Sequence, residues 1–311
     1  MKYPAPGRLI DIGGRRLHLH AMGQGPTVVF EAALGGSSVS WSLVQPRVAE
    51  FARACTVDRG GFGWSDAAPG PRTAGRIADE LRVLLERSGE PPPYVLVGHS
   101  FGGLVARIFA GRNPERTAGL VLVDPAQAED WLVPADYEQR RIDRGVTLCR
   151  YGARAARFGV ARTVSALVGA GALAPAWKLA QSFTRGELKA DDQWVLTPFL
   201  KLPPEVRGPI RQFWTQSKFF EALGSQIETM PVSARETLAA SPDGFGDLPL
   251  VTISAHDPGD HRKRQQTAIA ASSTRGRHVI ASTSGHWIPM DDPGVIVEEL
   301  RVMTRMINDM N

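Results

Sequence analysis

One serine lies where the chain must turn sharply. Ser100 is the centre of the pentapeptide Gly98-His99-Ser100-Phe101-Gly102, between an apolar run at 94–97 and a helical pattern at 104–109. Its two outer glycines let a strand turn into a helix without Cβ clashes, and the turn exposes the serine hydroxyl. The N-terminus of the following helix would stabilise an oxygen that gains negative charge. The pattern predicts a nucleophile; the alternative is a glycine-rich turn with an inert serine.

A serine nucleophile needs a general base at neutral pH, and histidine is the usual one. The chain has seven histidines. His286 lies in a loop with Gly285 and Pro289, after the last predicted strand and before the last predicted helix. Such a loop reaches the C-terminal edge of a parallel sheet, where active sites lie. We therefore expect His286 to be the base; the alternative is a structural histidine in a turn.

A carboxylate must orient this histidine and stabilise its charged form. Asp257 follows the predicted strand 250–254, and Asp124 follows the predicted strand 119–123. Either aspartate satisfies the chain order nucleophile, acid, histidine. We favour Asp257 and keep Asp124 as the alternative, because Asp124 could instead cap the turn that follows it. Asp260 is a lesser candidate.

The acid loop also contains residue types that bind metals. His256, Asp257, Asp260 and His261 lie within six positions, but their spacing matches no metal-binding motif. We therefore predict no metal site.

An oxyanion hole requires two backbone N–H donors. We expect one from Phe101, which follows the nucleophile, and one from Leu34, in the loop 31–38 after the predicted strand 27–30. The glycines of this loop allow close backbone approach; the alternative is a plain flexible loop. Further substrate contacts are expected from residues in these segments and beside the base. They are Gly35, Trp41, His99 and Trp287.

Alternating strands and helices must position these residues. The pattern predicts a hairpin around Gly13-Gly14, and helices at 41–51, 74–87 and 295–307. The strands include 27–30, 54–57, 94–97, 119–123, 250–254 and 278–280. Their continuous apolar character indicates a parallel sheet that is covered on both faces.

Residues 126–246 have a different pattern, with apolar residues at helical spacing and frequent prolines. We interpret this stretch as a helical cap inserted into a core formed by residues 1–125 and 247–311. Its aromatic residues suggest an apolar ceiling over a pocket, although packing within the cap explains most of them equally well. They are Trp131, Trp177, Phe183, Trp194, Phe199, Phe213, Trp214, Phe219 and Phe220.

The ordered motifs resemble those of the α/β-hydrolases. The matching segments are the loop 31–41 with Leu34-Gly35-Gly36, the segment 58–66 (Asp-Arg-Gly-Gly-Phe-Gly-Trp-Ser-Asp), Gly98–Gly103, Leu120–Pro125 and Gly285-His286. The resemblance implies a mostly parallel eight-stranded sheet flanked by helices, an inserted cap, no cofactor and a Ser-His-Asp mechanism. Two departures stand out. Leu34-Gly35 replaces the frequent His-Gly pair, and the acid loop lacks the glycine that usually precedes its aspartate.

The nucleophile type narrows the chemistry. Family members that act as dehalogenases or epoxide hydrolases carry an aspartate at the elbow, whereas this chain has Ser100. Carboxylic ester hydrolysis is the first interpretation, with a small and apolar acyl compound as the substrate. Other reactions of a serine triad are second: amide or lactone cleavage, carbon–carbon bond hydrolysis, acyl transfer or perhydrolysis. A non-enzymatic ligand-binding protein is third, since fold does not fix function.

Composition limits the partners. The chain has 311 residues, 43% hydrophobic and 22% charged, with a net charge of only +4. Its densest basic cluster, 261–264, is short and is typical of a solvated loop or a helix start, so we expect no nucleic-acid partner. No apolar run approaches the ~20 residues of a membrane span, and the N-terminus lacks a signal core, so a cytoplasmic location is expected. Neither Cys55 nor Cys149 suggests a disulfide.

Overall fold

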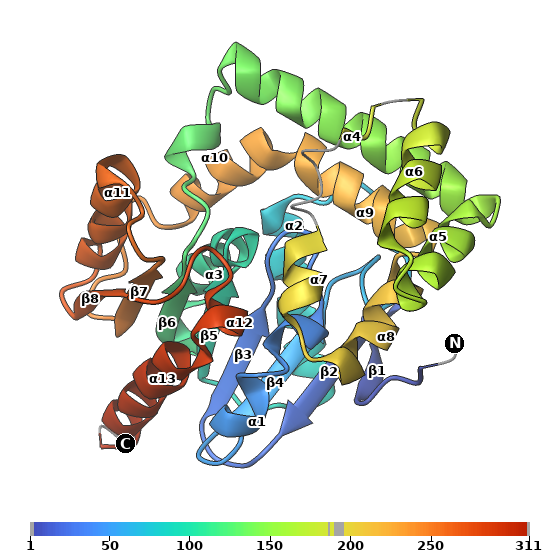
Figure 1. Cartoon of the computed structure of the whole chain (residues 1–311). Coiled ribbons are helices and arrows are strands. Elements are labelled where there is room, and N and C mark those ends of the chain that lie inside the picture. Colours follow the sequence, from blue (N-terminus) through green and yellow to red (C-terminus); the bar gives the residue numbers. More distant parts are fainter. Residues whose placement is uncertain (1–2, 186, 190–195, 310–311) are drawn as a thin grey trace.

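A computed structural model describes residues 3–185, 187–189 and 196–309 of the chain. Eight strands form one sheet in the order β1-β2-β4-β3-β5-β6-β7-β8 (Figure 1). Strands β1 and β2 are antiparallel to their neighbours, and the other six strands are parallel. The strands are β1 (Arg8–Asp11), β2 (Arg16–Met22), β3 (Thr27–Glu31), β4 (Arg53–Asp58), β5 (Tyr94–His99), β6 (Thr117–Val123), β7 (Leu250–Ser254) and β8 (Gly276–Ile280). This is the predicted mostly parallel eight-stranded sheet.

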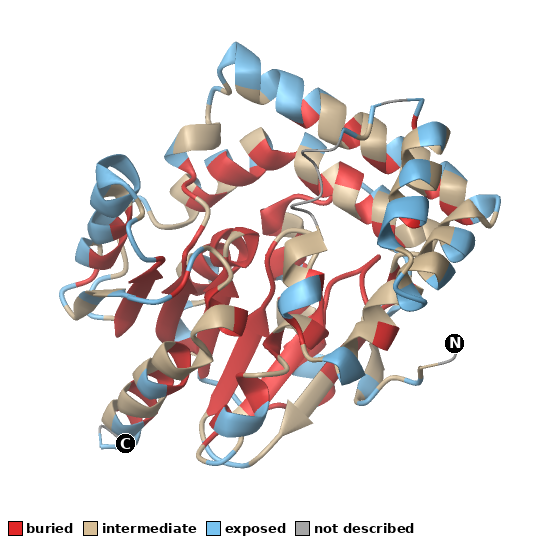
Figure 2. Ribbon diagram, in the orientation of Figure 1, coloured by how far each residue is buried: buried red, intermediate tan, exposed pale blue. Residues whose placement is uncertain are grey.

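The central strands are buried because helices cover both faces of the sheet (Figure 2). One face packs on α2 (Ala74–Ser88) and α3 (Phe101–Arg112), and the other packs on α1 (Gln45–Val48) and α13 (Pro293–Asn308). Helix α2 buries its predicted apolar stripe, which includes Ile77 and Leu81. Burial on two faces explains why these strands are continuous apolar runs rather than alternating ones.

Two helical segments differ from the prediction. The helix expected at 41–51 consists of a 3-10 turn, η1 (Ser38–Trp41), and the single turn α1. The sequence did not predict the extent of α11 (Asp260–Ala271), whose first turns contain the basic cluster for which a solvated loop or a helix start was expected. Its first two turns are polar, and it buries only Gln266, Ile269 and Ala270, so it lacks the apolar periodicity that identifies a helix in sequence.

Helices fill the chain between β6 and β7. They are η3 (Glu129–Trp131), α4 (Asp136–Arg157), α5 (Val160–Gly169), α6 (Leu173–Phe183), α7 (Thr197–Lys201), α8 (Pro204–Phe213), α9 (Ser217–Glu228) and α10 (Met230–Ala240). Figure 1 shows α4, α5, α6 and α9 gathered beyond one end of the sheet, where α4 packs along α9 and α5 packs on α6. Helix α10 packs instead on α2 and α3, and so joins the insertion to the core.

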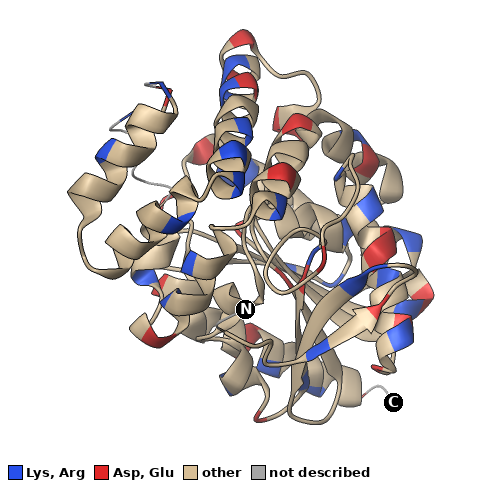
Figure 3. Cartoon of the chain, turned by 90° about the vertical axis from the view of Figure 1, so that its right-hand side faces the viewer, with Lys and Arg blue, Asp and Glu red and all other residues tan. Residues whose placement is uncertain are grey.

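The remaining short helices lie next to strands or to α13. They are η2 (Pro114–Arg116) and α12 (Ile288–Asp291). In the view of Figure 3, acidic and basic residues are interspersed over the helices. Over the described ranges, the chain has no helix with the length and apolar character that crossing a membrane requires.

Candidate active site

The chain turns sharply from β5 into α3 at the position of the predicted nucleophile elbow. Ser100 lies between the last residue of β5 and the first residue of α3, with φ 53° and ψ −117°. A serine in this region of backbone space is strained, and neighbouring contacts must hold it there. The Ser100 N–H donates to the Val123 carbonyl at 3.0 Å, and the Ser100 carbonyl accepts from Ala126 at 3.0 Å. In the described chain the Ser100 hydroxyl has no hydrogen-bond partner, which leaves it available for chemistry.

Two glycines of the elbow are sterically required. A Cβ on Gly98 would lie 2.4 Å from the Gly102 carbonyl oxygen, and a Cβ on Gly102 would lie 2.3 Å from the Glu31 carbonyl oxygen. Both separations are far below van der Waals contact with backbone atoms. The elbow therefore packs directly against the end of β3, where the loop that contains Leu34 begins.

His286 and Asp124 are paired in the structure. The Nδ1 atom of His286 lies 2.5 Å from Oδ2 of Asp124. With the proton on Nδ1, the histidine donates to the carboxylate and its Nε2 is left as a proton acceptor, which is the tautomer a general base requires. Asp124 is 1% exposed, while the His286 side chain is 37% exposed. His286 is thus accessible, and its carboxylate partner is buried.

The preferred prediction for the partner of His286, Asp257, is wrong. Asp257 is exposed and makes no contact with His286, and Asp260 is exposed at the start of α11. The reason is topological. Asp124 directly follows β6, the neighbour of the nucleophile strand β5, whereas Asp257 lies three residues beyond the end of β7, one strand further away. That loop contacts the histidine loop through a backbone hydrogen bond, in which the His256 N–H donates to the Ser284 carbonyl at 2.7 Å.

Helix α11 supplies partners of Asp124 that sequence analysis missed. Gln266 Nε2 donates to Asp124 Oδ1 at 2.7 Å, and Arg262 Nη1 lies 3.5 Å from Oδ2. Burial alone would raise the pKa of Asp124, but the hydrogen bonds from His286 and Gln266 and the charges of His286 and Arg262 lower it below its ordinary value. The carboxylate is therefore ionised at neutral pH.

The Gln266 amide is itself held in one orientation. Its Oε1 accepts a hydrogen bond from the Ser254 hydroxyl, which also contacts His278 Nε2. The amide NH₂ group therefore faces the carboxylate. No sequence motif marks Gln266, and its burial is evident only in the structure.

We predict that Gln266→Leu lowers kcat about 10-fold with little change in KM. Removing this donor leaves one oxygen of a buried carboxylate unpaired, which costs on the order of 1–3 kcal/mol. The measurement is steady-state ester hydrolysis. Gln265→Leu is the matched control, since the neighbouring Gln265 binds Asp130 instead. A Gln266→Leu enzyme with wild-type kcat and a lowered melting temperature would limit Gln266 to a role in stability.

Two predicted substrate contacts are buried instead. Trp41 is 0% exposed and packs on Phe30, and His99 is 1% exposed. His99 Nε2 lies 2.8 Å from the backbone carbonyl of His286, so it supports the histidine loop. Burial, aided by the charge of His286, lowers the pKa of His99 to about 3, which keeps the ring neutral. Neither Trp41 nor His99 lines the cavity described below, and both are buried, so we withdraw both as substrate contacts.

The two expected oxyanion donors are unpaired in the structure. Phe101 is the first residue of α3, and Leu34 lies in a turn after β3. Within the described residues, neither backbone N–H donates to another group of the protein. Unpaired N–H groups at a helix start are ready donors for an anion.

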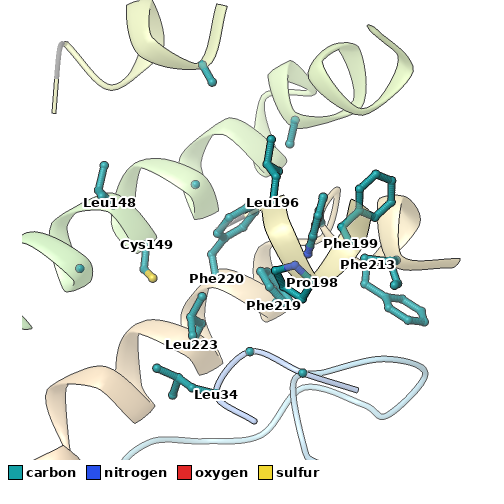
Figure 4. A pocket seen from close by; sticks show the side chains of 18 of the residues that line it. Leu34, Leu148, Cys149, Leu196, Pro198, Phe199, Phe213, Phe219, Phe220 and Leu223 are labelled. Atoms are coloured by element: carbon teal, nitrogen blue, oxygen red, sulfur yellow. The ribbon is translucent and has the colours of Figure 1, made fainter. Parts of the chain in front are cut away.

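A cavity of about 730 Å³ adjoins this site, between the loop after β3 and the inserted helices (Figure 4). Leu34, Gly35 and Trp287 line it, whereas Ser100 and His286 do not. Figure 4 shows Leu34 and Leu223 on one side of the space, and Leu148 and Cys149 on α4 opposite. All eight described aromatic residues of the predicted ceiling line the cavity, and the ninth, Trp194, lies outside the described residues.

Ionisable clusters do not suggest a metal. Among the described residues, no group of three or more His, Cys, Asp and Glu side chains is arranged to hold a metal ion. Cys55 and Cys149 are free, buried thiols, and burial raises the pKa of each to about 12, so neither is a reactive thiolate at neutral pH.

A comparison of the sequence with models of protein families identifies the family of this chain. The model of the alpha/beta hydrolase fold matches residues 26–293, which is most of the chain. The chain belongs to the alpha/beta hydrolase family. Ser100, His286 and Asp124 lie within the matched region.

Relatives of this alpha/beta hydrolase match shorter stretches. An uncharacterized protein of Bacillus subtilis (strain 168), YqjL, is 37% identical over 102 residues, which are 33% of this chain and 40% of that protein. A 2-hydroxymuconate semialdehyde hydrolase of Pseudomonas sp. (strain CF600) is 33% identical over 126 residues, 40% of this chain and 44% of that enzyme. The matched stretches thus span less than half of these relatives.

Solved structures share the fold over nearly the whole chain. A thermophilic esterase from Thermogutta terrifontis superposes with a TM-score of 0.64 at 21% identity, covering 94% of both chains. The epoxide hydrolase CorEH superposes with a TM-score of 0.69 at 18% identity, covering 96% of this chain and 98% of the other. At these identities the likeness concerns the fold alone.

Proposed function

We propose that this hydrolase cleaves carboxylic esters through an acyl-enzyme on Ser100. One observation carries the proposal: His286 is paired with a buried carboxylate at 2.5 Å, and its backbone carbonyl lies 2.8 Å from His99 Nε2, next to the serine of the strained elbow. These are the residue types of a nucleophile, a base and an orienting acid. An aspartate at the elbow would instead form an ester with the substrate, so Ser100 favours acyl transfer over epoxide opening.

The proposed cycle uses only groups of this chain and water. His286 Nε2 takes the proton of the Ser100 hydroxyl while the Ser100 oxygen attacks the ester carbonyl carbon. The N–H groups of Leu34 and Phe101 hold the oxyanion that forms. As the tetrahedral intermediate collapses, His286 gives its proton to the departing alcohol. His286 then deprotonates a water molecule, which attacks the acyl-enzyme; as the bond to Ser100 breaks, His286 returns the proton to the Ser100 oxygen and the acid is released. Asp124 stabilises the charged imidazole in both halves of the cycle.

We further propose that the insertion acts as a cap and that its cavity binds the acyl chain. The volume of about 730 Å³ falls within the usual range for ligand pockets, ~300–1,000 Å³. The cavity begins at Leu34, which we assign to the oxyanion hole, so a chain attached to the reacting carbonyl has a short path into it. Its lining is dominated by aliphatic and aromatic side chains, which favour an apolar group.

We predict that kcat/KM rises about 3- to 4-fold for each CH₂ added to the acyl chain, since burying one CH₂ is worth about 0.8 kcal/mol. The measurement is a panel of 4-nitrophenyl esters from acetyl to dodecanoyl. The matched variant is Leu223→Trp, because Leu223 lies beside Gly35 at the cavity floor. In Leu223→Trp the increase in kcat/KM should stop at a shorter acyl group, while hydrolysis of the acetyl ester is retained. If kcat/KM does not change with acyl length in either protein, the proposal that the cavity binds the acyl chain is contradicted.

Hydrolysis of other carbonyl compounds is the second candidate, because one relative is named for a semialdehyde substrate. Amides, lactones and such a semialdehyde belong in the same panel. A serine-reactive phosphonate separates both candidates from a ligand-binding protein, which would not be labelled. We propose that the protein acts without a cofactor or a nucleic-acid partner, and the cytoplasmic location stays a prediction from the sequence.

A further inference from the structure

We propose that Arg59 is a positioning residue that holds both halves of the oxyanion hole in register. This inference rests on the proposed function, since it concerns the donors Leu34 and Phe101. Arg59 directly follows β4, in the segment 58–66, and its side chain is 3% exposed. No part of the proposed cycle uses it.

The guanidinium of Arg59 binds three consecutive residues at the end of β3. Its Nε donates to Glu31 Oε2 at 2.7 Å, Nη1 donates to the Ala33 carbonyl at 3.3 Å, and Nη2 donates to the Ala32 carbonyl. The Glu31 side chain is 2% exposed. A buried ion pair of this kind needs its remaining donors satisfied, and here backbone carbonyls of the loop satisfy them.

These bonds fix the direction of the Leu34 N–H. The Ala33 carbonyl accepts from Arg59 and, at 3.0 Å, from the Gly36 N–H, so it points to the inside of the turn. In a trans peptide the carbonyl and the following N–H point in opposite directions. The Leu34 N–H must therefore point away from Arg59 and out of the turn. Gly35 completes the turn with φ +70°, a conformation that glycine adopts without strain.

The same guanidinium contacts the other half of the hole. Its Cζ atom lies 5.0 Å from the centroid of the Phe101 ring, a cation–π arrangement. The two halves also touch directly, because a Cβ on Gly102 would lie 2.3 Å from the Glu31 carbonyl oxygen. Arg59 thus lies between the segment that supplies the first donor and the residue that supplies the second.

The neighbouring Asp58 anchors the far end of the loop. Its Oδ1 accepts from the Ser38 N–H at 2.6 Å, and its Oδ2 accepts from the Trp64 N–H at 3.0 Å. The loop is therefore held at residues 32–33 by Arg59 and at residue 38 by Asp58. Preorganised donors of this kind stabilise a developing charge without reorganising during the reaction.

The test is Arg59→Lys, which keeps the charge but lacks the planar fork that reaches three oxygens. The matched control is Arg53→Lys. Arg53 makes a two-point ion pair with Glu90 at the opposite end of the same strand, far from the site. We expect Arg59→Lys to lower kcat about 10²-fold, comparable to the loss of one oxyanion donor, with KM changed less than about 3-fold. Affinity for a trifluoromethyl ketone, which forms an oxyanion on the serine, should fall in parallel.

Amide hydrogen exchange gives a readout that does not depend on turnover. In Arg59→Lys the Gly36 amide, which is bonded within the turn, should exchange at least about 10-fold faster, while Arg53→Lys leaves it unchanged. Unchanged exchange, or faster exchange with wild-type kcat, would overturn the role of Arg59. A wild-type protein that neither hydrolyses esters nor labels with a phosphonate would instead refute the proposed function, and the exchange result would still show whether Arg59 holds the loop.

Discussion

Replacing Ser100 by alanine should abolish ester turnover, with kcat lowered about 10⁵- to 10⁶-fold, the loss seen when a triad nucleophile is removed. The hydroxyl supplies the oxygen of the proposed acyl-enzyme, and no neighbouring atom replaces it. The melting temperature should stay close to that of the wild type, because the hydroxyl makes no hydrogen bond within the described chain and the Cβ is retained. Steady-state hydrolysis and thermal melting check the two parts of this prediction.

Ser282→Ala is the matched control for Ser100→Ala, since Ser282 is an exposed serine in the loop that contains His286. It should keep wild-type kcat and phosphonate labelling. If Ser100→Ala keeps its activity and labels at another residue, the nucleophile is not Ser100.

Asp124→Asn should lower kcat about 10⁴-fold, the effect of the corresponding change in a well-studied triad. Asparagine keeps the shape but removes the charge that stabilises protonated His286, and it can favour the wrong histidine tautomer. Because the pKa of Asp124 lies below its ordinary value, the native carboxylate remains ionised throughout the neutral range, and the variant lacks that charge at every working pH. Some loss of stability is also expected, since a depressed pKa contributes stability above the pKa of the unfolded state.

Asp257→Asn is the control that separates the two aspartates. Asp257 is exposed and forms no hydrogen bond or ion pair with His286 among the described residues. The kcat of Asp257→Asn should therefore stay within about 2-fold of the wild-type value, as for a surface substitution away from the site. An inactive Asp257→Asn together with an active Asp124→Asn would return the role of the acid to the loop after β7.

The sequence predicted the framework because its signals are local. The continuous apolar runs of β3 to β7 and the stripe of α2 arise from burial on two faces, and each can be recognised within a few residues. The elbow is equally local, since the glycines that its sharp turn requires lie within two residues of Ser100. The same holds for His286, whose loop lies between two recognisable elements.

The identity of the acid depended on information that is not local. Both Asp124 and Asp257 follow buried strands, and only the strand order shows that β6 is the direct neighbour of β5. The missing glycine before Asp257 was a real signal in favour of Asp124. Gln266 could not be found, because it acts from a helix whose polar sequence conceals it and its partner lies 142 positions away.

The insertion between β6 and β7 shows a further limit of sequence-based prediction. Its aromatic residues were evident in the sequence, but packing among its helices and lining a pocket require the same residue types. Only the arrangement of α4, α6, α8 and α9 around a common space decides that these rings face a cavity. Spacing within each helix cannot provide this, because it does not show how the helices are placed around one another.

The most direct test of the central claim is to trap the acyl-enzyme. Wild-type protein is mixed with excess 4-nitrophenyl ester, quenched in acid within milliseconds to seconds, digested and analysed by mass spectrometry. We predict an adduct with the mass of the acyl group on the peptide that contains Ser100, its accumulation matching a burst of nitrophenol. The adduct should persist longer in Asp124→Asn, where water is activated more slowly. Turnover without any covalent adduct, or an adduct on a residue other than Ser100, would contradict the proposed mechanism.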